Sequence, residues 1–396
     1  MYNTTRKKNC AILLVSLVVV SIPLAVHLLA MFTFLGRSTR HMVWREPEEP
    51  FFPGDENMLF IGNSYTGFHN LPNLVEEALV AGKPEEYSSK SPWIKSRISA
   101  EGATTATSTA STKTTKQVHV ASHTPGGETF AGHRKGLEFG DDFPCYHYDY
   151  YYRGDYLRRW ITLSEGKKYY WKWVTLQNHS WQPQFYKSLD TNEQAIYDES
   201  VEHAKYINEA IQQHYPHAKT LFIMTWGRPN DDLFLTMQEN TRQGYLHYVT
   251  ATSTPDRQTY VAPVGMVFET IYKDQLAAGI ERPAKSSLFY DLYDKGDHHP
   301  SLMGSYVAAV TIYATMMGIT SLENEFTWKP HGLEEATAAT LRHAVRRTIQ
   351  ETIDQKMIQY PWQTETATLP STTASTAEAA ATKSMPTASS PTGPSN

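Results

Sequence analysis

The chain has 396 residues and a formal net charge of −5 at pH 7, with 19% of its residues charged. That length accommodates one large domain or two ordinary ones together with tails, and the charge gives no support for a nucleic-acid partner. Its only two cysteines are Cys10 and Cys145. Because Cys10 lies in an apolar N-terminal run, we expect no intrachain disulfide in the remainder of the chain.

The N-terminus begins with a short tail, residues 1–9, whose basic cluster at 6–8 precedes an almost entirely apolar run at 10–35. A helix needs about 20 apolar residues to cross the hydrocarbon core of a membrane. The run is also longer than the roughly 7–15 apolar residues of a cleaved signal peptide. We therefore predict a single transmembrane signal anchor, with the rest of the chain luminal or extracellular. Three arginines at 37–45 weaken the charge argument for that orientation.

The remaining chain divides by composition. A Pro-rich linker, 36–56, leads into a predicted domain at 57–355, and a Ser/Thr-rich tail follows at 361–396. A Thr/Ser/Ala-rich stretch at 98–116 interrupts the domain. Neither Ser/Thr-rich segment has enough apolar residues to bury a core, so we predict a disordered insertion and a disordered tail.

Within the domain, strand-like and helix-like patterns alternate. The expected strands are 58–61, 173–177, 220–225 and 260–264, and the expected helices are 71–79, 195–213, 239–251, 302–317 and 338–349. Such alternation predicts an α/β fold with a parallel sheet covered by helices on both faces. The sequence has no Gly-rich dinucleotide fingerprint and no phosphate loop, so we expect no nucleotide cofactor. It has no His/Cys cluster with zinc-site spacing, so we expect no metal.

One serine stands where a predicted strand meets a predicted helix. The apolar strand 58–61 is followed by Gly62, Asn63 and Ser64, and helical periodicity begins at Leu71. In open α/β folds, clefts form at the carboxyl ends of the strands. Ser64 is therefore a candidate nucleophile, and the alternative is a serine that only caps the helix.

A turn-rich segment near the other end of the domain supplies a candidate base. Asp294, Asp297, His298 and His299 lie within eight residues, just before the predicted helix 302–317. A serine nucleophile needs a base, and the base needs an acid that sets its tautomer. The alternative is a solvated polar loop or a helix cap.

Four segments, in this order along the chain, resemble the SGNH (GDSL-type) hydrolase superfamily. They are 60–66, 124–133, 174–183 and 293–301. The first reads Gly-Asn-Ser-Tyr-Thr at 62–66, which is typical of one branch of that superfamily. The segments at 225–228, 260–264 and 304–306 also look like this branch, so the resemblance covers nearly the whole predicted domain.

The resemblance implies a flavodoxin-like three-layer α/β/α domain with an esterase-type site. By this resemblance, Ser64 is the nucleophile and His299 is the general base. The oxyanion donors would be the backbone N–H of Ser64, the N–H of Gly126 or Gly127, and a side-chain amide from the third segment. Such donors stabilise a tetrahedral intermediate by several kcal/mol.

The acid departs from the superfamily pattern. It usually lies three residues before the base, where this chain has Gly296. Asp297 is the first candidate and Asp294 the second. A register shift of one residue would instead bring His298 into the site.

The side-chain amide donor also departs from the superfamily pattern, because the third segment, 174–183, lacks the usual Gly-x-Asn-Asp. Asn178 is the first candidate, Gln177 the second, and His179 a third polar group. Asn178, His179 and Ser180 also form an N-glycosylation sequon. Glycosylation conflicts with a role in the site, and we expect Asn178 to be buried and unmodified.

Three further residues, Trp226, Arg228 and His133, lie in segments that resemble the superfamily. Trp226 and Arg228 end a predicted strand on the side of the sheet where Ser64 lies, so we expect them to line the pocket. The alternative is a core tryptophan beside a surface arginine. His133 is expected to be structural.

These observations predict a membrane-anchored serine esterase that cleaves short acyl esters, with acetyl esters of carbohydrates as the expected substrates. The carbohydrate expectation rests on the resemblance and on the aromatic content of 12%. The alternatives are a lipid esterase, an acyltransferase that uses the same residues, and a non-catalytic surface protein that keeps the fold. The expected partners are thus an ester substrate and a membrane, without nucleic acid or nucleotide.

Overall fold

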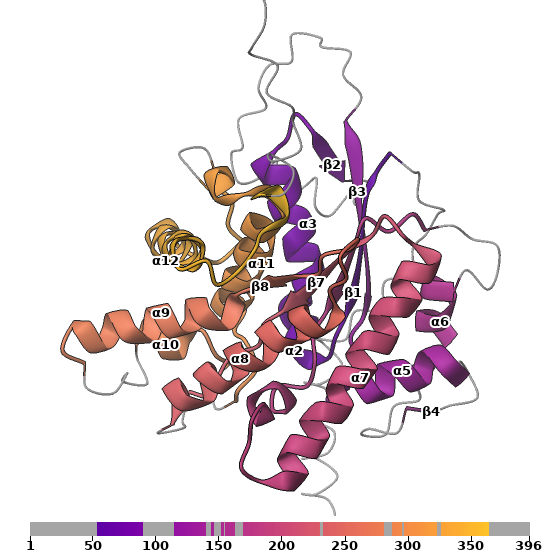
Figure 1. Cartoon of the computed structure of the whole chain (residues 1–396). Coiled ribbons are helices and arrows are strands. Elements are labelled where there is room, and N and C mark those ends of the chain that lie inside the picture. The colour runs from indigo at the N-terminus through magenta and orange to yellow at the C-terminus, as the bar shows by residue number, and fades with distance from the viewer. Residues whose placement is uncertain are drawn as a thin grey trace, which may run out of the picture.

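A computed structural model of the protein describes residues 54–89, 115–139, 144–145, 152–153, 155–162, 169–229, 233–280, 287–294, 297–322 and 326–363 (Figure 1). The predicted anchor, nearly all of the predicted insertion and nearly all of the predicted tail lie outside these residues. Within them, no helix is both long enough and apolar enough to cross a membrane.

The described residues contain a six-stranded sheet in which every neighbouring pair is parallel. Its spatial order is β2-β3-β1-β6-β7-β8. The strands are β1 (Glu56–Ile61), β2 (Tyr87–Ser89), β3 (Lys116–His123), β6 (Trp173–Leu176), β7 (Lys219–Ile223) and β8 (Tyr260–Ala262). Without the short edge strand β2, this order is the 2-1-3-4-5 order of flavodoxin. The predicted flavodoxin-like parallel sheet is confirmed.

Helices cover the sheet on two sides. The helices are α2 (Ser64–Gly67), α3 (Leu71–Gly82), α5 (Phe130–Phe139), α6 (Asp155–Thr162), α7 (Thr191–His214), α8 (Phe234–Thr252), α9 (Val264–Ala277), α10 (Leu288–Asp291), α11 (Leu302–Met317) and α12 (Glu335–Asp354). α11 packs on α3, α9 and α12, whereas α7 packs on α5, α6 and α8. Figure 1 shows the α3–α11–α12 group on one side of the strands and α5, α6 and α7 on the other.

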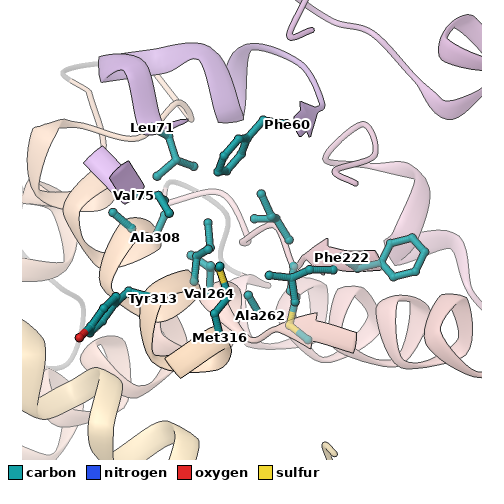
Figure 2. Close-up of a cluster of buried hydrophobic side chains, with 14 of the residues drawn as sticks. Phe60, Leu71, Val75, Phe222, Ala262, Val264, Ala308, Tyr313 and Met316 are labelled. Carbon is teal, nitrogen blue, oxygen red and sulfur yellow. The ribbon is translucent and has the colours of Figure 1, made fainter. Parts of the chain in front are cut away.

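The core on one side of the sheet centres on α11, which is buried from Gly304 to Met316. A helix that is apolar around its whole circumference is stable only when other elements surround it. Leu71 and Val75 of α3 lie against this core, beside Ala308 of α11 (Figure 2). Each such buried aliphatic side chain contributes about 1.5–3 kcal/mol of transfer free energy.

The ends of several elements differ from the expected ranges for local reasons. α7 begins at Thr191, because the Asp190 side chain accepts from the backbone N–H of Asn192 at 2.8 Å and of Glu193 at 3.2 Å. Such an N-cap satisfies amides that the helix itself leaves unpaired. α5 and α9 were not predicted, nor was β3, which begins at the last residue of the predicted insertion.

The packed part of the chain continues past the predicted domain end at 355. Ile358 and Tyr360 are buried, and the Tyr360 hydroxyl lies 2.7 Å from Thr352 Oγ1 of α12. Two small strands, β4 (Pro144–Cys145) and β5 (Tyr152–Arg153), pair antiparallel outside the main sheet.

Candidate active site

Ser64 lies at the first position of α2, immediately after the carboxyl end of β1. The Asn63 side chain caps this helix by accepting from the backbone N–H of Tyr65 at 3.1 Å. A Cβ at Gly62 would lie 2.7 Å from Thr66 Oγ1 and 2.8 Å from Gln177 Oε1. The turn therefore requires glycine at position 62, and it places the Ser64 hydroxyl at the edge of the sheet.

His299 and Asp297 reach Ser64 from 235 residues away in the sequence. Ser64 Oγ lies 2.7 Å from His299 Nε2, and His299 Nδ1 lies 2.7 Å from Asp297 Oδ2. When Nδ1–H donates to the carboxylate, Nε2 is left as an acceptor for the Ser64 hydroxyl. The three side chains thus have the geometry of a Ser-His-Asp triad.

Asp297 is held as a carboxylate. Hydrogen bonds from His298 and from His299 keep the pKa of Asp297 far below its usual range, and they outweigh its partial burial. Asp297 Oδ1 accepts from the backbone N–H of His298 at 2.6 Å and lies 2.8 Å from His298 Nδ1. Its two oxygens therefore serve two adjacent histidines.

Asp294, the other candidate acid, shapes the loop. Its side chain is exposed, and its backbone N–H donates to the carbonyl of His299 at 2.9 Å. The backbone N–H of Asp297 donates to the Asp294 carbonyl at 3.0 Å. The structure therefore brings the carboxylate of Asp297, and not that of Asp294, to His299.

Two rings enclose the imidazole of His299. The Phe68 ring stacks on one face, with centroids 4.2 Å apart and planes inclined by 6°. The His298 ring stacks against His299 at 4.6 Å and 28°. His298 therefore lies beside His299, and His299 is the histidine whose ring contacts Ser64. Sequence reasoning missed Phe68, and the only signal for it is its place four residues after Ser64.

Trp226 packs against the loop that carries His298 and His299. It is 1% exposed, stacks on Phe268 at 4.6 Å, and donates from Nε1 to the His298 carbonyl at 3.3 Å. The buried ring of Tyr65 lies 5.0 Å from Trp226 and 5.4 Å from His299. Trp226 therefore does not line an open pocket, which corrects the expectation from the sequence.

The Gly126–Gly127 turn approaches the serine turn. Glu128 N–H donates to the Pro125 carbonyl at 3.3 Å, and Gly127 has a φ of +69°, which favours glycine. Asn63 Nδ2 ties the two turns together by donating to the Glu128 carbonyl at 2.9 Å. No acceptor in the described parts of the chain takes the backbone N–H of Ser64, Gly126 or Gly127.

Gln177 is part of the scaffold of the serine turn. It is fully buried, and its Oε1 accepts from Asn63 N–H at 3.0 Å and from Thr66 Oγ1 at 2.9 Å. Its Nε2 donates to the Asn178 carbonyl. The oxygen and one N–H of this amide are therefore used within the protein.

Asn178 is equally buried and occupied. Its Nδ2 donates to Tyr248 Oη at 2.8 Å, and its Oδ1 accepts from the Phe130 backbone N–H at 3.2 Å. One N–H of each of these two amides is used within the protein, and the expectation that Asn178 or Gln177 donates to an oxyanion stays a prediction. The burial of Asn178 agrees with the expectation that its sequon is unmodified. The third polar residue, His179, accepts at Nδ1 from the Trp181 N–H at 3.4 Å.

Two further histidines pack behind the serine turn. His123 and His133 are fully buried, with ring centroids 5.3 Å apart. Burial lowers the pKa of His123 to about 4 and lowers that of His133 well below its usual value. Both rings are therefore neutral at pH 7, which fits the structural role expected for His133.

One group of side chains in the described residues has metal-ligand spacing, with donor atoms within 4.8 Å of one another. It consists of Asp297, His298 and His299. These atoms already contact each other, and His299 also contacts Ser64. A bound cation would compete with the triad for the same atoms.

Comparison with known proteins found no matching protein-family profile and no matching curated protein. Solved structures with a similar fold include a gut microbial diltiazem-metabolizing enzyme, at 12% identity and a TM-score of 0.40. That match covers 67% of this chain and 47% of the enzyme, so the chain spans about half of its length.

Two other similar structures are covered almost completely. One is Axe2, an acetylxylan esterase from Geobacillus stearothermophilus, at 13% identity and a TM-score of 0.35, covering 70% of this chain and 96% of Axe2. The other is described as a GDSL-like lipase from Parabacteroides merdae, at 14% identity and a TM-score of 0.34, covering 65% and 93%. These scores carry no functional assignment. The strand order of the chain itself is that of flavodoxin-like three-layer folds.

Proposed function

We propose that this protein is a serine esterase that works through an acyl-enzyme. The observation that carries the proposal is the continuous hydrogen-bonded chain from Ser64 through His299 to Asp297, with both contacts at 2.7 Å. Nucleophile, base and orienting acid in that order are what acyl transfer to serine requires. The same contacts argue against a degraded, non-catalytic site.

The reaction follows from the placement of the protons. His299 Nε2 takes the Ser64 proton while Oγ attacks the ester carbonyl, and Asp297 stabilises the resulting imidazolium. The imidazolium then protonates the departing alcohol, which leaves an acyl ester on Ser64. In the second half, His299 deprotonates a water molecule that attacks this ester, and the acid is released as Ser64 regains its proton.

The negative charge on the oxygen of the tetrahedral intermediate needs hydrogen-bond donors. The backbone N–H groups of Ser64 and of the Gly126–Gly127 turn can be those donors, because they have no acceptor within the described residues. One such preorganised donor contributes about 3–4 kcal/mol to transition-state stabilisation. No side-chain amide is assigned as a third donor.

We infer that the acyl group is short, such as acetyl, and that the alcohol is a carbohydrate. The superfamily resemblance suggests this class, and Trp181, a 40% exposed residue in the loop that follows β6, supports it. Such a ring offers an apolar face against which a sugar can pack.

The anchor at 10–35 and a luminal or extracellular site are also part of the proposal. They are supported by the apolar character of that run. The full chain should then stay with membranes during alkaline extraction, and a chain that lacks residues 1–35 should be released. Release of both by the same treatment would contradict the anchor.

The activity test uses the full chain with 4-nitrophenyl acetate. We expect hydrolysis by the wild type that is insensitive to a chelator, and loss of at least about 10³-fold in kcat for Ser64→Ala and for His299→Ala. His343→Ala is the matched control, since His343 is exposed on α12. Hydrolysis that persists in Ser64→Ala, or that is absent in the wild type, would refute the esterase proposal.

A further inference from the structure

Arg228 stands in the loop after β7, with its guanidinium 4.1 Å from the ring centroid of Trp181. Trp181 lies in the loop after β6, and the strands β1, β6 and β7 are neighbours in that order. Because the strands are parallel, the loops after them lie at the same edge of the sheet as Ser64. The arginine–tryptophan pair is therefore on the face that carries the triad.

The positive charge of Arg228 has no anionic partner within the described part of the chain. Four other arginines there pair with carboxylates, namely Arg134, Arg242, Arg342 and Arg347. Arg228 has no such pair, and its Nε is buried without an acceptor. A guanidinium carries five N–H donors and favours a carboxylate that it can bind through two of them.

The charge of Arg228 is close enough to Tyr65, the residue after Ser64, to affect the pKa of its hydroxyl. Tyr65 follows Ser64, and its ring packs 5.0 Å from Trp226, two residues before Arg228. Burial raises the pKa of Tyr65, whereas the positive charge of Arg228 acts to lower it. The backbones of β1 and β7 lie about 10 Å apart across β6, which is comparable to the length of a sugar ring with its substituents.

We propose that Arg228, positioned over the ring of Trp181, binds a carboxylate of the substrate beside the scissile ester. Stacking on an aromatic ring leaves the edge of a guanidinium open for two parallel hydrogen bonds. A single arginine matches a singly charged group. The inference rests on the proposed esterase function and narrows its substrates to esters that carry a carboxylate, in either the acyl or the alcohol part.

The test compares kcat/KM within two matched pairs of substrates, using the full chain. The acyl pair is 4-nitrophenyl acetate and mono-4-nitrophenyl succinate. The alcohol pair is an O-acetylated methyl glucoside and the corresponding O-acetylated methyl glucuronide. We expect the charged member of one pair to be favoured by about tenfold or more, and the pair that shows it identifies the source of the carboxylate.

Variants assign that preference to Arg228. Arg228→Gln should reduce the charged-to-neutral ratio by about tenfold, and Arg228→Lys should restore only part of it. The matched control is Arg134→Gln, because Arg134 also stacks on an aromatic ring, Tyr206 at 4.5 Å, but is paired with Glu138 on α5. The control should keep the wild-type ratio.

Two results would overturn the inference: a wild type without preference in either pair, or a ratio unchanged in folded Arg228→Gln. If Arg228→Gln does not fold, as judged by circular dichroism, the test is the charged-to-neutral ratio of kcat/KM of the wild type, measured in 0.05 and in 1 M NaCl. A charge-based preference falls with salt, and one that does not fall refutes the role of Arg228. Failure of the esterase proposal looks different, since none of the four esters would then be cleaved, or cleavage would survive Ser64→Ala.

Discussion

The carboxylate of Asp297 accepts hydrogen bonds from two successive histidines, and only one of them faces Ser64. The backbone bond from His298 fixes Oδ1, which leaves Oδ2 for the ring of His299. In the proposed mechanism the acid therefore lies two residues before the base. Backbone hydrogen bonds of Asp294 with His299 and Asp297 close the loop between them.

The exchange of Asp297 for Asn tests this assignment. An amide at position 297 can donate to His299 Nδ1 and thus favours the wrong tautomer, so kcat should fall by roughly 10³–10⁴-fold. Asp294→Asn, which keeps the backbone turn, should change kcat by less than about tenfold. Ester hydrolysis at pH 8 measures both variants, and a larger loss in Asp294→Asn than in Asp297→Asn would reverse the assignment.

We expect Phe68 to be a positioning residue, because its ring stacks on that of His299. Phe68→Leu should leave the ring of His299 free to tilt away from Ser64, and a small misplacement of a base is costly. We expect kcat to fall by about tenfold with little change in KM, and Phe68→Tyr to restore most of it. A purely structural role predicts loss of folded protein instead, with normal kcat per folded molecule.

At the scale of elements, the turn after β1 is held by groups from two other segments. Gln177, just after β6, accepts from Asn63, while Asn63 donates to the loop before α5. Asn178 in turn joins α5 to α8 through Phe130 and Tyr248. Buried side-chain amides that satisfy backbone groups of neighbouring loops make such an edge rigid.

The buried histidine pair behind this turn makes stability depend on pH. Above pH 6.5, His123 and His133 are neutral in both the folded and the unfolded chain. Below it the unfolded chain takes up protons that the folded protein excludes, so the free energy of unfolding falls as the pH drops toward about 4. For His123 alone this loss amounts to about 3 kcal/mol across that window.

Urea unfolding at pH 7.5 and pH 4.5 measures this effect. His123→Leu should shrink the difference in stability between the two pH values by about 2.5 kcal/mol, whereas His343→Gln on the exposed face of α12 should not. An unchanged difference in His123→Leu would show that other groups dominate the acid sensitivity.

At the scale of the whole molecule, α11 lies at the core of the fold and also follows the histidine loop. Its N-cap, Ser301, accepts from the backbone N–H of Met303 at 3.1 Å and of Gly304 at 3.3 Å, and its hydroxyl donates to the Asp291 carbonyl. The loop that carries His299 is thus tied to the most deeply buried helix. The distant sequence segments that carry Ser64 and His299 meet in one domain, in which α3, the helix after the Ser64 turn, packs on α11.

Local patterns were sufficient for much of this architecture. Apolar runs followed by helical periodicity predicted β1, β6, β7, β8, α3, α7, α8, α11 and α12, because burial on one helix stripe or on both faces of a strand leaves its period in the sequence. β3 and α5 escaped prediction, since β3 adjoins the Ser/Thr-rich stretch and α5 is a short helix with only four buried residues. The Ser64 turn and the Asp–His loop were visible as motifs.

The sequence by itself thus determined the fold class and the two segments that carry Ser64 and His299, because both depend on residues close together in the chain. Only the tertiary structure decided which aspartate faces His299, that Phe68 and His298 stack on its ring, and which loops Gln177 and Asn178 join. Those outcomes depend on the directions of side chains within the folded loops and on contacts between separate segments, and no local sequence pattern encodes such directions.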